Sequence, residues 1–163
     1  MITFVKTSEK SILCPVSSDE NMIIEALNAD VVIIDPDFKN FGSDGMATPE
    51  TAVICFELIK NANFAEMFNA FSNKLDALAF TKDQIVSFCG KYPHKLEQDG
   101  NPSLFLANFF LYKNKKNNKF FVAIVSALSS GIGLGTNSLQ REEFWHSTGR
   151  HRVWVPATCS LKS

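Results

Sequence analysis

The chain lacks the features that mark secreted, membrane-spanning and repeat proteins. Residues 1–6 contain no basic segment followed by an apolar one, so the sequence predicts no signal peptide. The longest nearly apolar run, residues 120–128, is about half the length that a helix needs to cross a bilayer. No internal repeat or low-complexity tract is present. We therefore expect a cytoplasmic protein without a membrane partner.

Paired cysteines are also missing. The four cysteines are scattered, and none occurs in a Cys-x-x-Cys motif. Scattered thiols in apolar surroundings are typical of reduced, buried cysteines in a chain of this size. The sequence predicts neither a disulfide framework nor a metal site, and no cofactor is expected.

Tyrosine and tryptophan are scarce, with two of each, whereas phenylalanine occurs 15 times. Phenylalanine has no polar tip, so most of these rings are expected inside the protein. The chain has 163 residues, of which 45% are hydrophobic and 20% charged. These values fit one globular domain, residues 1–163, with a core rich in aromatic rings.

Charge is unevenly distributed between the two halves. Residues 1–81 contain 5 Lys and Arg against 12 Asp and Glu, whereas residues 82–163 contain 11 against 5. The acidic and basic halves can attract each other within one fold. Alternatively, the basic half faces an anionic partner.

The first hundred residues are predicted to be mainly helical, with one or two short strands at residues 2–6 and 31–34. Apolar residues at helical spacing favour helices over residues 21–28, 52–59, 64–78 and 84–92, although the 52–59 pattern also allows a strand. Capping boxes begin two of these helices, at Asn63 with Glu66 and at Thr81 with Gln84.

From residue 101 onwards the pattern changes to that of strands. Residues 104–112 and 120–128 predict a β-hairpin, joined by a basic connection over residues 113–119. Residues 131–135 predict a bulged turn or a third strand, and residues 152–155 a last strand. The predicted fold class is α+β, in which amphipathic helices of an N-terminal αβ region pack on a C-terminal antiparallel β-meander.

Two carboxylates follow the predicted strand at residues 31–34. The segment from Val31 through Asp35-Pro36-Asp37 resembles the opening motif of the haloacid-dehalogenase-like phosphatases. That resemblance implies Mg²⁺ binding and phosphoryl transfer by Asp35 and Asp37. It is confined to residues 31–37, and no later Asp-Asp pair is present. Asp-Pro-Asp also forms a good turn by itself.

Cys89 is a third candidate for catalysis. It would act as a nucleophile if the fold brought it to one of the three histidines, His94, His146 or His151. However, Cys89 lies on the apolar stripe of the predicted 84–92 helix, which favours a buried and inert thiol.

The segment 145–154 combines aromatic and basic side chains. Aromatic rings stack on bases and basic groups bind phosphates, while Trp and Arg are also enriched at protein interfaces. The predicted partner-binding residues are Trp145, His146, Arg150, His151, Arg152 and Trp154, with Lys115 and Lys116 of the hairpin connection. The alternative is an ordinary strand whose outer residues pair with nearby acidic groups.

These patterns favour a non-catalytic binding or regulatory module over an enzyme. Its predicted contact surface is the basic, aromatic-containing face of the C-terminal sheet, with a protein or nucleic-acid partner. The alternative is a Mg²⁺-dependent phosphoryl hydrolase that uses Asp35 and Asp37.

Overall fold

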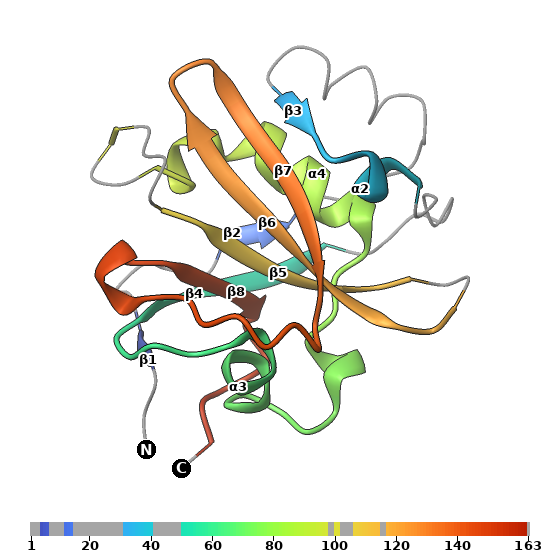
Figure 1. Cartoon of the computed structure of the whole chain (residues 1–163), viewed down its shortest axis with the longest axis vertical. Helices are drawn as coiled ribbons and strands as arrows, with labels where there is room; N and C mark the ends of the chain where they lie inside the picture. Colours follow the sequence, from blue (N-terminus) through green and yellow to red (C-terminus); the bar gives the residue numbers. More distant parts are fainter. Residues whose placement is uncertain are drawn as a thin grey trace.

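The computed structural model describes residues 4–6, 12–14, 31–40, 50–97, 100–101, 106–114 and 117–162. These residues form a mixed sheet of eight strands with short helices on both faces, so the architecture is α+β (Figure 1). No helix in the described ranges is long and apolar enough to span a bilayer.

In chain order, the described elements are β1 (Phe4–Lys6), β2 (Ile12–Cys14), β3 (Val31–Ile34), α2 (Pro36–Asn40), β4 (Thr51–Leu58), α3 (Phe64–Asn69), the 3₁₀ helix η1 (Leu75–Ala77), α4 (Lys82–Lys91), η2 (Pro93–Lys95), β5 (Asn108–Lys113), β6 (Phe120–Leu128), β7 (Gly131–Ser138), η3 (Ser147–Gly149) and β8 (Arg152–Pro156). Most of these helices lie between β3 and β5 along the chain.

The sheet is mixed, not the purely antiparallel meander predicted from the sequence. Its strand order is β1-β4-β8-β5-β6-β7-β3, and β2 also pairs with β4. The β5–β8 and β3–β7 pairs are parallel, whereas the other pairs are antiparallel. The β5–β6 hairpin is confirmed, but β3 and β4 of the N-terminal half belong to the same sheet.

The prediction of a helix over residues 52–59 is wrong, because this segment is β4. Alternate residues pack on opposite faces: Val53 and Cys55 on the face with α4, and Phe56 and Leu58 on the face with α3. A strand covered on both faces is apolar at nearly every position, and such a run also matches helical spacing. The β-branched pair Val53-Ile54 predicted the secondary structure of this segment better than the helical spacing did.

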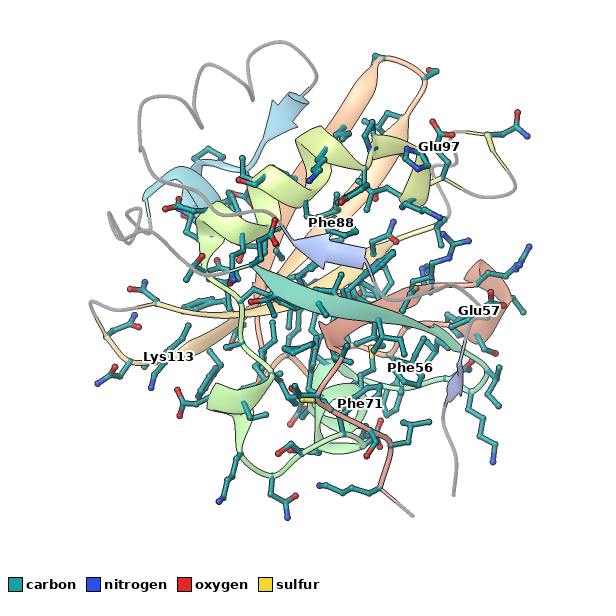
Figure 2. All side chains as sticks on the ribbon, turned by 180° about the vertical axis from the view of Figure 1, so that it is seen from behind. Phe56, Glu57, Phe71, Phe88, Glu97 and Lys113 are labelled. Carbon is teal, nitrogen blue, oxygen red and sulfur yellow. The ribbon has the colours of Figure 1, made fainter. Side chains whose placement is uncertain are left out.

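Each face of the sheet carries its own layer of core side chains. On one face, Phe88 of α4 packs against Trp154 and Phe110, with ring centroids 4.8 and 5.4 Å apart (Figure 2). On the other face, Phe56 and Phe71 lie 4.8 Å apart beneath α3. The abundance of phenylalanine therefore fills two core layers.

The predicted helix 64–78 is shorter in the structure than in the sequence pattern. The Asn63–Glu66 capping box is confirmed, but α3 ends at Asn69. The Ser72 hydroxyl accepts a hydrogen bond from the Lys74 amide, which competes with helical hydrogen bonding. Leu78 is still buried in the same core layer, so the apolar face was predicted correctly although the helix was not continuous.

The helix α4 follows its sequence prediction, including the Thr81–Gln84 capping box. Gly90 lies near its C-terminal end, is exposed, and has no atom within 4 Å of the place where a Cβ would be. Replacing Gly90 with Ala should therefore raise the free energy of unfolding by about 0.5–1 kcal/mol, because alanine loses less backbone entropy in a helix. Urea denaturation of both proteins measures this change, and a decrease in stability would contradict it.

The remaining secondary-structure predictions divide into confirmed and untested ones. The residues 131–135 begin a regular strand, β7, and the last predicted strand is β8. The predicted strand at residues 31–34 is β3, and β1 lies within residues 2–6. The predicted helix at residues 21–28 lies outside the described residues.

Candidate functional site

Two segments distant in sequence pair along one side of the molecule. Residues 59–63 follow β4, and residues 144–150 lead into β8; we call them together the strip. Ala62 and Trp145 form an antiparallel bridge through two backbone hydrogen bonds of 3.2 and 2.9 Å. The Leu58 amide also donates to the His151 carbonyl at 2.8 Å. In Figure 1 the orange-red chain before β8 runs beside the green chain between β4 and α3.

Asn61 fixes the two segments to each other. Its Oδ1 accepts hydrogen bonds from the Ser147 amide at 3.0 Å and from the Ser147 hydroxyl at 3.3 Å. Asn61 Nδ2 lies 3.2 Å from His146 Nδ1. Because Oδ1 is the acceptor for Ser147, Nδ2 faces His146 and donates to it. The exposed His146 is therefore held with a defined ring position on the surface.

Arg150 closes one end of the strip. It has left-handed backbone angles, with φ 53° and ψ 34°, and it caps the 3₁₀ helix η3. Its Nε and Nη2 donate to the two carboxylate oxygens of Glu57 on β4, each at 3.3 Å. The geometry is bidentate, so this ion pair orients the guanidinium as well as neutralising its charge.

Aromatic rings support the strip from below. The Trp145 ring lies 4.8 Å from Phe109 and 5.8 Å from Phe64, measured between centroids. The His151 ring is 5.0 Å from Trp145 in a T-shaped contact. Trp145 is half-buried, and the strip therefore rests directly on the core layer beneath α3.

His151 is a buried histidine with a defined hydrogen bond. Its side chain is 7% exposed, and its Nδ1 accepts a hydrogen bond from the Ala107 amide at 3.1 Å. Burial, with a smaller contribution from His146, lowers the pKa of His151 below 6.5. At neutral pH the ring is uncharged. Because the side chain is buried, the structure contradicts the prediction that His151 belongs to the partner-binding surface.

The strip exposes two large apolar side chains that the sequence analysis did not single out. Phe144 is 53% exposed and Ile59 is 44% exposed, and among the described residues they are the exposed large hydrophobic side chains. Phe144 follows Glu142 and Glu143 in the sequence. The sequence indicated the exposure of Phe144 only by its place after two acidic residues and outside any periodic pattern.

Two other predicted partner-binding residues are bound to neighbouring segments by side-chain hydrogen bonds. Trp154 is 1% exposed, and its Nε1 donates to Asn108 Oδ1 at 2.9 Å. Arg152 is half-buried, and its Nη1 donates to the backbone carbonyls of Lys95 and Glu97 at 3.0 and 3.1 Å. The prediction of a stacking surface on Trp154 is therefore wrong, because the sheet is covered on both faces.

The structure describes only part of the basic hairpin connection. Lys115 and Lys116 lie outside the described residues, but Lys113 at the base of their connection is described. Lys113 binds Asp76 at 2.8 Å, and in Figure 2 it lies on the opposite side of the molecule from Glu57, the partner of Arg150. Of the predicted residues, the structure brings Trp145, His146 and Arg150 together at the surface.

Asp35 lies between β3 and α2, and Asp37 lies in the first turn of α2. The Asp37 amide donates to Asp35 Oδ1 at 2.9 Å, which is the local turn that Asp-Pro-Asp favours. Asp35 also lines a shallow, mainly apolar hollow of about 420 Å³ beside Ile124, Leu128 and Gly133. The described residues contain no group of three His, Cys, Asp or Glu side chains that is arranged to bind a metal ion.

Cys89 is fully buried in the core layer beneath α4. A substrate in solvent does not reach a thiol in that position, and His94, five residues later, is exposed. The structure therefore contradicts a nucleophilic role for Cys89, because the apolar stripe of α4 faces the sheet.

The comparisons with known proteins add no relative. No family model, no curated protein and no solved structure matches this chain.

Proposed function

We propose that the chain is a non-catalytic binding module that recognises a protein partner through the strip. The observation that carries this proposal is Phe144, an exposed aromatic side chain directly before the bridged residue Trp145. Exposed rings on an ordered backbone lose little conformational entropy when they bind, and they dominate the energetics of many protein interfaces. Ile59, on the opposite segment of the strip, is also an exposed large apolar side chain.

The charge of the strip favours a protein over a nucleic acid. Arg150 is paired with Glu57, and Arg141, just before the strip, forms an ion pair of 2.6 Å with Glu143. A site that binds phosphates needs cations available to replace released counterions. Mixed charges around an apolar centre instead resemble the polar rim of a protein interface.

Replacing Phe144 with Ala should weaken partner binding by about 30-fold or more, the effect of losing a hot-spot side chain of roughly 2 kcal/mol. The experiment captures proteins on the immobilised unmodified chain from nuclease-treated extract, purifies the protein that is retained, and measures its Kd for the unmodified chain and for Phe144→Ala by titration calorimetry. Far-UV circular dichroism and urea denaturation should show an unchanged fold, since Phe144 is exposed.

The matched control is Lys119→Ala, which removes an exposed side chain at the β5–β6 connection, away from the strip. It should leave the Kd unchanged. If Phe144→Ala binds the purified partner as tightly as the unmodified chain, the strip is not the contact surface.

A gel-shift titration with RNA and single-stranded DNA at low salt tests the nucleic-acid alternative. We expect no shift. A shift that disappears in the double variant Lys115→Ala, Lys116→Ala would transfer the contact to the hairpin connection and contradict the proposal.

A further inference from the structure

We propose that His151 is an acid-sensitive latch for the strip: its neutral ring fastens residues 144–150 to the segment before β5, and protonation releases them. This inference rests on the function proposed above, because it concerns the regulation of the same surface. It also has consequences for the free protein that can be measured without any partner.

The latch is a side-chain hydrogen bond between distant parts of the chain, and beside it the Arg152 amide donates to the Ala107 carbonyl at 2.9 Å. The Ala107 amide donates to His151 Nδ1 at 3.1 Å, across 44 positions of sequence. An imidazole that accepts at Nδ1 carries its one proton on Nε2, whereas an imidazolium has protons on both nitrogens and cannot accept. Protonation therefore replaces an attractive contact with two opposed donors in a buried place.

The His151 ring has little room to find another position. A Cβ built on Gly149 would lie 2.3 Å from His151 Nε2, so the backbone of η3 lies directly against that edge of the ring. Trp145 and Phe109 contact the ring as well, at centroid distances of 5.0 and 5.8 Å. Because both Trp145 and Gly149 belong to the strip, displacement of the ring moves the strip.

The charged groups around His151 do not offset the positive charge of its protonated ring. His146 acts on the ring from the same strip and disfavours its protonated form. Arg150 and Arg152 flank it in the chain, while Ala107 and Phe109 on the other side carry no charge. Glu57, which lies opposite Arg152 in the β4–β8 register, has its carboxylate bound to Arg150. A proton on His151 therefore meets no unpaired carboxylate among these groups.

The sign of the pH effect follows from the lowered pKa of His151. The released ring has a pKa near 6.5, whereas the latched ring has a lower one. The released state therefore binds more protons between these two values, so the latch is fully effective above about pH 6.5 and weakens as the pH falls towards the folded pKa. Within that window the opening equilibrium increases about tenfold for each pH unit.

The test measures hydrogen exchange and the two indole NMR signals of the unmodified chain from about pH 7.5 to 5, the range in which histidine titrates. The protection factor of the Ala107 amide, corrected for intrinsic exchange, should fall by about tenfold per pH unit between pH 6.5 and the lower pKa of the latched ring, and then level off. The Trp145 indole should shift over the same range. The Trp154 indole, bonded to Asn108, should not, since local release leaves the other core layer intact.

Two variants separate His151 from other titrating groups. In His151→Gln the amide oxygen accepts a hydrogen bond without titrating, so Ala107 protection should become independent of pH. The matched control His146→Gln should retain the acid response and move its midpoint towards 6.5, because the unfavourable effect of His146 on the protonated ring is removed. If His151→Gln does not fold, the titration of the unmodified chain still decides the matter.

A protection factor of the Ala107 amide that does not change with pH in the unmodified chain would overturn the latch. A shift of the Trp154 indole signal together with the Trp145 signal would also overturn it, because it indicates global unfolding. Retained acid sensitivity in a folded His151→Gln variant would also overturn it. These results are independent of partner binding, whereas an unchanged Kd for Phe144→Ala refutes the proposed function alone.

Discussion

Replacing Asn108 with Asp is expected to destabilise the protein by about 3–5 kcal/mol at pH 7, the cost of a buried charge without a full set of partners. Asn108 is fully buried in β5. Its Oδ1 accepts from Trp154 Nε1, and its Nδ2 donates to the carbonyls of Leu96 and Val125 at 3.0 and 3.3 Å. In the Asp variant a carboxylate oxygen would face these two carbonyls, where the native side chain has a donor.

The comparison variant is Asn108→Leu, which keeps the approximate volume and carries no charge. It leaves three polar groups without their partner, at about 1–3 kcal/mol for a buried unsatisfied group. Urea denaturation at pH 7 and pH 5 should show that Asn108→Asp regains part of its stability in acid, since a protonated carboxyl donates to one carbonyl, whereas the loss in Asn108→Leu does not depend on this protonation. A change below about 1 kcal/mol for Asn108→Asp at pH 7 would show that the site relaxes without cost.

Replacing Gly149 with Ala should cost about 1–3 kcal/mol, the usual penalty for overpacking a closed site. The added Cβ would lie 2.3 Å from His151 Nε2 and 2.5 Å from Cε1. Gly149 belongs to a 3₁₀ helix whose backbone alanine adopts readily, so the penalty is steric. Urea denaturation measures the loss, and the Trp145 indole signal should shift because the His151 ring must move.

Gly135→Ala is the matched control for this variant. Its new Cβ would meet the nearest atoms, the Cβ and carbonyl oxygen of Ile124, at 3.9 Å, which is ordinary van der Waals contact. We expect its free energy of unfolding to stay within about 1 kcal/mol of the original, since glycine is itself unfavourable in a strand. Equal losses of unfolding free energy in the two variants would mean that the His151 ring moves aside for the new Cβ without an energetic penalty.

The parts of the fold predicted from sequence are those fixed by local interactions. Both capping boxes and the β5–β6 hairpin depend on residues close in the chain, and the structure contains all three. The sheet order depends on pairing between distant strands, such as β4 with β8, for which a local pattern holds no information. The error at residues 52–59 has the same origin, because a strand covered on both faces has no polar alternation.

The candidate site was predicted in part for a similar reason. The segment 145–154 was identified by composition, but composition does not say which side chains a two-sided sheet buries. Trp154 and His151 became core residues, whereas Trp145, His146 and Arg150 remained near the surface. Phe144 was missed because an isolated exposed aromatic residue belongs to no periodic pattern.

The place of β8 in the sheet has a consequence for biosynthesis. β8 lies between β4 and β5, yet the ribosome makes it after every other described strand. Until residues 152–156 emerge, β4 and β5 each present an unpaired edge, and unpaired edges promote association between nascent chains. The middle of the sheet therefore closes last, and the newly made protein depends on rapid closure or on a chaperone during that interval.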